Sequence, residues 1–185
     1  MNDQSSTKGP DVGTADPTDG RKQYEWESKY PSEAVSKIRV EAVYVVILFF
    51  LSLSLILATW KGLSANIVGV TGNEAETLKK YCYYGFSGLL GGTIFSIKYL
   101  YRSVARGYWH LGRRLWRFLS PLTSLGLAFA IGALLEASII SVRTPASGPA
   151  VIGIGFLIGY FADSAVAKMH EVAEVLFGTT IRPKN

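Results

Sequence analysis

The sequence predicts an all-α integral membrane protein: a bundle of four transmembrane helices, with a disordered N-terminal tail and a C-terminal cytoplasmic helix extension. Three observations lead to this prediction. The 185-residue chain is 49% hydrophobic and only 18% charged. Its apolar residues are gathered in four blocks without charged side chains, whereas a soluble protein spreads them at amphipathic spacing. The basic residues cluster outside those blocks.

Each block has about the length that a helix needs to cross a bilayer. A helix rises about 1.5 Å per residue and the hydrocarbon layer is about 30 Å thick, so about 20 apolar residues suffice. We expect spans at about residues 42–60, 81–101, 118–142 and 149–167. The second and fourth blocks are rich in glycine, and a buried or re-entrant segment is the alternative for them.

The membrane domain is expected to cover residues 32–178. Residues 1–31 are predicted to be a disordered cytoplasmic tail, because they contain too few large apolar residues to offset the entropy of ordering. Residues 179–185 form a second tail. Pro31 and Ser32 indicate the start of a helix. Tyr30, just before them, suits either the headgroup layer or a protein surface.

Charge distribution predicts the orientation. Four spans place 15 of the 19 basic residues on the side of the two termini, and only Lys61, Lys79, Lys80 and Arg143 on the other. The positive-inside rule then makes both termini cytoplasmic, in a multi-pass protein of the cell inner membrane.

The connector between the second and third spans mixes arginine with aromatic residues. Such a mixture predicts contact with the membrane interface, with rings at headgroup depth and guanidinium groups near phosphates. An ordinary basic cytoplasmic loop is the alternative. The residues concerned are Arg106, Trp109, Arg113, Arg114, Trp116 and Arg117.

Small residues recur at four-residue spacing on three of the spans. This pattern lets helix backbones approach closely inside a membrane, where no hydrophobic effect drives association. It fits packing within one chain and self-association equally well, so a homo-oligomer is one expectation. The helix-packing glycines are Gly88, Gly92, Gly132, Gly155 and Gly159.

Two acids, Glu136 and Asp163, lie near the ends of the third and fourth spans. Acids at membrane depth are costly, which makes both candidates for a pore or a proton relay. The alternative is a structural or interfacial role, with Arg114 or Arg117 as the partner of Asp163.

Enzyme chemistry has no positive support in the sequence. We find no hydrolase, phosphate-loop or zinc-site motif, and His110, His170 and Cys82 are single residues without ligand spacing. We therefore expect no catalytic, cofactor-binding or metal-binding residues, no cofactor, and no direct binding of nucleic acid.

The stretch from Gly159 to Gly178, GYFADSAVAKMHEVAEVLFG, resembles a helix ending found in small bacterial multi-span membrane effectors of anti-phage defence, including retron-associated transmembrane proteins. The resemblance implies a membrane-perturbing effector that a cytoplasmic protein partner controls. The function expected first is thus a non-enzymatic effector or interaction protein that acts on the lipid bilayer, and the resemblance implies antiviral defence as its setting. The alternatives are a small channel or transporter and a structural subunit of a larger membrane complex.

Overall fold

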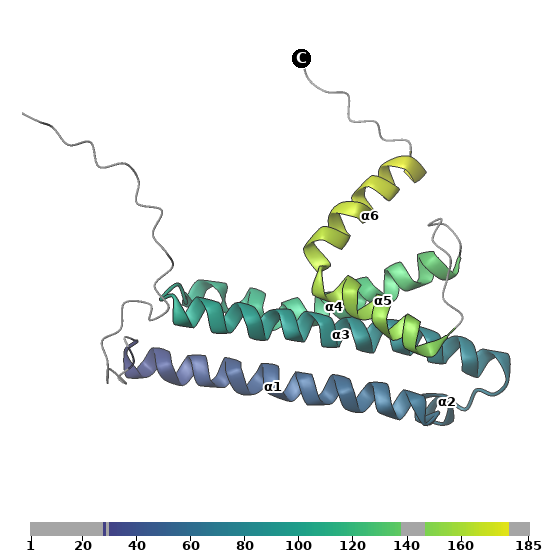
Figure 1. Cartoon of the computed structure of the whole chain (residues 1–185), viewed down its shortest axis with the longest axis horizontal. Coiled ribbons are helices and arrows are strands. Elements are labelled where there is room, and N and C mark those ends of the chain that lie inside the picture. Colours follow the sequence, from purple (N-terminus) through teal and green to yellow (C-terminus); the bar gives the residue numbers. More distant parts are fainter. Residues whose placement is uncertain (1–27, 29, 138–146, 178–185) are drawn as a thin grey trace, which may run out of the picture.

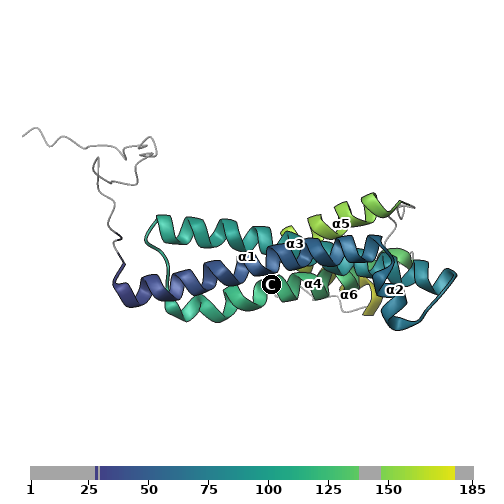
Figure 2. The same cartoon turned by 90° about the horizontal axis from the view of Figure 1, so that it is seen from below.

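The structure is a computed structural model that describes residues 28, 30–137 and 147–177. In these residues the chain forms an elongated bundle of helices (Figure 1; Figure 2). The elements are α1 (Ser32–Trp60), α2 (Leu63–Val68), α3 (Asn73–Ala105), the short 3-10 helix η1 (Leu111–Arg113), α4 (Arg114–Glu136), α5 (Gly148–Tyr160) and α6 (Ala162–Phe177).

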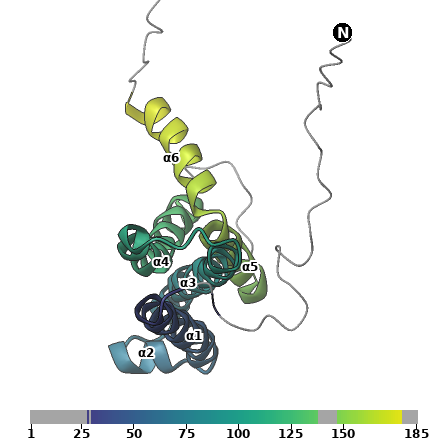
Figure 3. The same cartoon turned by 90° about the vertical axis from the view of Figure 1, so that its left-hand side faces the viewer.

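The central element is α3, which packs against α1, α4 and α5. Figure 3 looks along the bundle and shows α3 between these three helices. Both α1 and α4 end at the side of the bundle where α3 and α5 begin, so α1 and α4 run antiparallel to α3 (Figure 1). α6 turns away from the bundle axis.

Two helical segments of the described chain are long and apolar enough to cross a membrane, Ser32–Trp60 and Leu111–Glu136. The same test does not select α3, although α3 is the longest helix, because tyrosine, glycine, serine and threonine lower its hydropathy. Many of these small and polar residues are buried against α4 and α5. The four-span count is therefore not confirmed, whereas the all-helical, membrane-compatible fold is.

The fourth apolar block is not one straight helix, contrary to the expected span at 149–167. The chain leaves helical geometry at Phe161, and α5 and α6 meet at an angle of 99°. Together the two helices pass the spanning test, so they are a broken span or a re-entrant segment. We call this break at Phe161 the elbow.

The other boundaries also differ from the expected spans. α3 begins at Asn73 and ends at Ala105, beyond both ends of 81–101. α4 ends at Glu136, with Ala137 as its C-cap, whereas the sequence predicted a span to residue 142. Residues 138–142 and most of both predicted tails lie outside the described residues. α1 begins at Ser32, as Pro31 and Ser32 indicated.

Two apolar clusters hold the bundle together, one toward each end. Tyr83, Tyr84, Leu135 and Val151 belong to the cluster that joins α3, α4 and α5. Val45, Leu100 and Trp109 form the second cluster, which joins α1 to the end of α3 and to the connector after it. Elsewhere α1 exposes large apolar side chains, as expected for a helix that faces lipid.

Candidate functional site

A buried ion pair stands at the end of the bundle where α1 begins. Glu41, on α1, is 2% exposed, and Arg117, on α4, is 5% exposed. Arg117 donates from Nε to Glu41 Oε2 over 2.8 Å and from Nη2 to Glu41 Oε1 over 3.0 Å. A two-point contact of this kind is among the strongest hydrogen-bonding arrangements in proteins.

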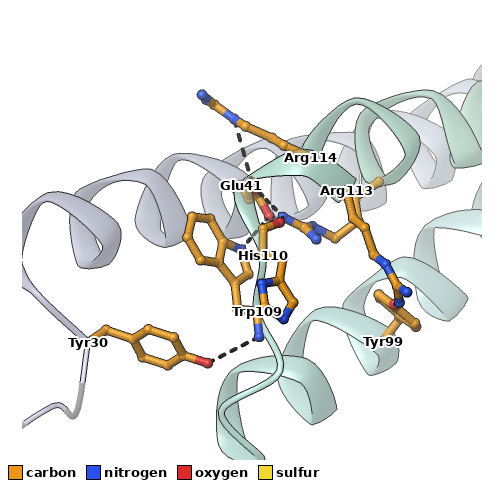
Figure 4. A network of polar contacts seen from close by, with 8 residues as sticks. Tyr30, Glu41, Tyr99, Trp109, His110, Arg113 and Arg114 are labelled. Carbon is orange, nitrogen blue, oxygen red and sulfur yellow. Dashed lines mark hydrogen bonds and ion pairs between the residues drawn. The ribbon is translucent and has the colours of Figure 1, made fainter.

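The connector between α3 and α4 closes over this pair. Trp109 donates from its indole Nε1 to Glu41 Oε2 over 3.1 Å, and Arg114 Nε lies 3.7 Å from Glu41 Oε1 (Figure 4). Arg117 Nη2 also donates to the backbone carbonyl of His110 over 3.2 Å. We call Glu41, Trp109, Arg114 and Arg117 the Glu41 cluster. Each polar atom of Glu41 has a partner, which is the condition under which a buried charge is tolerated.

Tyr30 also bonds to the same connector. Its hydroxyl lies 3.3 Å from the carbonyl of Val104 and accepts a bond from the Trp109 backbone N–H, also over 3.3 Å. Of the two locations that the sequence left open for this ring, the structure therefore places it on protein. Trp109 in the connector is thus held both by Tyr30, just before α1, and by Glu41, within α1.

The Glu41 cluster corrects one expectation. Trp109 and Arg117 were predicted to contact the membrane interface, but both side chains are buried inside the protein. Arg114 or Arg117 was named as a partner for Asp163, and both pair with Glu41. The side chain of Asp163 is not among those that the structure describes, so its partner stays a prediction. Sequence reasoning missed Glu41 because this acid sits just before the first apolar block and so reads as its boundary.

The remaining connector residues point outward. Arg106, Arg113 and Trp116 are exposed. Arg113 Nη1 donates to the hydroxyl of Tyr99 over 3.4 Å. The ring of Trp116 packs at 5.2 Å from that of Tyr99, measured between centroids. These side chains retain the placement that an interfacial role requires.

At the opposite end of the bundle, Glu136 also has partners. Lys80 Nζ lies 3.3 Å from Glu136 Oε2, and the hydroxyl of Tyr84 donates to Glu136 Oε1 over 3.5 Å. This tie joins α3 to α4. A carboxylate held by a lysine and a phenol fits the structural role better than that of a pore-lining acid.

The five predicted glycines stand at close contacts between α3, α4 and α5. A Cβ atom added at any of them would collide with a neighbouring helix: Gly88 with Ala128, Gly92 with Ser124, Gly132 with Tyr84, Gly155 with Ser87, and Gly159 with the backbone of Gly88. Gly91, which the sequence analysis did not single out, meets the carbonyl of Phe156 in the same way. These small faces are thus used inside the chain.

A small pocket of about 120 Å³ lies at the elbow, between α3, α4 and the junction of α5 with α6. Ser120, Ser124 and Ser164 supply its polar wall, and Phe95, Tyr160 and Phe161 supply aromatic rings. Across the described residues, no three His, Cys, Asp or Glu side chains gather closely enough to hold a metal ion. The described contacts are ion pairs and hydrogen bonds that join helices, together with the bend at Phe161. None of them pairs a nucleophile with a base.

Comparisons with known proteins add no relationship: no protein-family model, no curated protein and no solved structure matches the chain.

Proposed function

We propose that this protein is a non-enzymatic, multi-pass effector of the cell inner membrane, and that it perturbs the bilayer when a cytoplasmic protein partner that holds it inactive releases it. α1, α3, α4 and α5 would form the anchor, and α6 the moving part, which turns at the elbow. The resemblance of the Gly159–Gly178 stretch to effectors of anti-phage defence suggests antiviral defence as the setting. The elbow is the observation that carries the proposal.

A single residue makes the elbow. Phe161 has φ −104° and ψ 35°, whereas a helix needs ψ near −42°. Helical hydrogen bonds persist on both sides, because the Phe161 N–H donates to the Leu157 carbonyl over 3.0 Å and the Ala165 N–H to the Phe161 carbonyl over 2.9 Å. Rotation at this one residue would therefore join α5 and α6 into one helix. Hinges of a few residues at element ends are a common device in switching proteins.

Lengths explain why the change would matter to a bilayer. α5 has 13 residues and is about 20 Å long, which is shorter than the hydrocarbon layer of about 30 Å. A continuous α5–α6 helix would cross completely and carry Lys168 and Glu171 out on the far side. The even number of spans would then bring the C-terminus to the basic, cytoplasmic side, in agreement with the positive-inside rule.

The Glu41 cluster and the glycine contacts supply the rigid frame against which α6 would move. Gly155 and Gly159 hold α5 close against α3, where an added Cβ would collide with Ser87 and Gly88. A partner that binds α6 would favour one of the two elbow states, and it could shift the balance only by binding the two states with different affinity.

Overexpression without the partner tests the proposal. We expect membrane depolarisation and slowed growth, measured with a potential-sensitive dye and normalised to membrane-inserted protein. Ala162→Pro should abolish both effects, because proline is tolerated at the first position of α6 but breaks a continuous helix. Ala162→Ser, which keeps the backbone N–H, is the matched control and should act as wild type. If wild type leaves potential and growth unchanged even at high level, the effector proposal fails and a structural subunit is favoured.

A further inference from the structure

Two exposed cations near the Glu41 cluster have neutral partners. Lys98 Nζ donates to the hydroxyl of Tyr160 over 2.9 Å, and Arg113 Nη1 donates to that of Tyr99 over 3.4 Å. In the part of the chain that the structure describes, no carboxylate forms an ion pair with either cation. A phenol occupies one donor of each group, and an ammonium has three donors and a guanidinium five. Both cations thus keep donors for an anion.

Aromatic rings connect the two cations. Phe95, Tyr99 and Trp116 lie within 6.5 Å of one another between centroids, and Phe95 lies 6.1 Å from Tyr160. We call these four residues the aromatic shelf. It draws on α3, α4 and α5, and Trp116 is 44% exposed at its rim. Rings with a polar edge favour the layer where headgroups meet acyl chains.

The positions of Lys98 and Arg113 along the bundle agree with the headgroup layer. Lys98 directly follows residues 81–97 of α3, which carry no charged side chain. Arg113 lies five residues before the corresponding uncharged stretch of α4, residues 118–135. The two cations therefore mark the same edge of the apolar slab. Arg114 and Arg117, at a similar level, are already committed to Glu41.

We propose that Lys98 and Arg113 bind the phosphate of an anionic phospholipid, whose acyl chains lie along the aromatic shelf. The ammonium and the guanidinium contact the phosphate oxygens, while Tyr99 and Tyr160 hold the two cations in place. Tyr160 is the last residue of α5. The lipid therefore binds next to the residue directly before the elbow. The site requires insertion in a membrane but not that the protein permeabilises it.

Lipid retention tests this site independently of any effector activity. The full chain is purified in detergent, supplied with equal amounts of phosphatidylglycerol and phosphatidylcholine, and its retained lipids are counted by native mass spectrometry. Wild type should prefer phosphatidylglycerol. Lys98→Gln with Arg113→Gln should reduce that preference roughly twenty-five-fold, because each basic residue contributes about a factor of five at an anionic surface. Lys98→Arg alone should retain the preference.

Arg39→Gln with Arg102→Gln is the matched control. It removes two exposed cations from the same end of the bundle without touching the shelf, and it should retain the preference. Equal loss in the two double variants would mean diffuse electrostatic attraction and would overturn the site, as would the absence of any preference in wild type. A third arm adds millimolar inorganic phosphate: displacement of the lipid by phosphate would indicate a site for a free anion in place of a lipid.

Discussion

Arg117 and Glu41 form a two-point ion pair across 76 residues of sequence, with Nε 2.8 Å from Oε2 and Nη2 3.0 Å from Oε1. The pair ties the start of α4 to α1, and the connector between α3 and α4 folds over it through Trp109. Because both charges are buried, the energetic consequence of removing one is larger than that of removing an exposed pair.

Glu41→Gln should therefore lower the free energy of unfolding by about 3 kcal/mol, since it leaves the Arg117 guanidinium buried without a counter-charge. Thermal unfolding of the purified protein in detergent measures this. Arg114→Gln is the control: Arg114 is 36% exposed at its side chain and 3.7 Å from Glu41, so its loss should cost about 1 kcal/mol or less. Replacing Glu41 and Arg117 together by leucine should cost less than Glu41→Gln. Equal losses for Glu41→Gln and Arg114→Gln would contradict the central place of the Arg117 pair.

The glycine contacts predict a contrast between two neighbours on α5. Gly155→Leu should destabilise the bundle by about 1–3 kcal/mol or more, because a Cβ there would lie 2.7 Å from the Tyr84 carbonyl oxygen. Gly153→Leu should be close to neutral, since nothing lies within 4 Å of a Cβ at that position and lipid accepts the side chain. Size-exclusion profiles and melting temperatures in detergent compare the two. The same tolerance at both positions would refute close packing of α5 on α3.

Glu136 is expected to act as a helix tie. Glu136→Gln should cost about 1 kcal/mol, because Lys80 is partly exposed and its ion pair is partly screened. The depolarisation per inserted molecule should not change. A pore lined by this acid would instead lose cation flux at unchanged protein level, and that result would restore the channel alternative.

Topology gives a separate prediction. A periplasm-active reporter fused to the N-terminus should be inactive. The same reporter fused to the C-terminus should be inactive in molecules whose α5–α6 helix is continuous, because an even number of spans leaves both termini on the cytoplasmic side. A fusion at residue 70, in the connector between α2 and α3, should be active and serves as the positive control. An active C-terminal fusion would mean that α5 and α6 do not complete a span.

The sequence predicted the helical class and the extents of α1 and α4 better than the rest. Long charge-free blocks identify such helices directly. α3 was harder, because its glycines and serines make it less apolar, and its burial comes from neighbours that only the fold supplies. The elbow has no local signal: no proline or glycine stands at Phe161, and the apolar block continues through it to Asp163.

In the candidate site, too, local sequence patterns predicted some features and only the fold revealed others. The spacing of Gly88, Gly92, Gly132, Gly155 and Gly159 predicted close contacts, and only the structure assigns them to contacts within the chain. The arginine-rich connector was visible as a pattern, but its division into inward and outward residues depends on Glu41. An acid paired across 76 residues of sequence cannot be found from local spacing. Nor can the meeting of Lys98 with Tyr160.

The distance across the elbow tests the proposed switch most directly. Spin labels on Pro149→Cys and Glu171→Cys, in a chain whose Cys82 is replaced by serine, report it by pulsed electron paramagnetic resonance in lipid nanodiscs. With the 99° bend the two backbone positions should be about 22 Å apart, and in a continuous helix about 33 Å. We predict that both distances are populated without a partner, and that Ala162→Pro removes the longer one. A single short distance in the wild-type background, unchanged by Ala162→Pro, would contradict the switch.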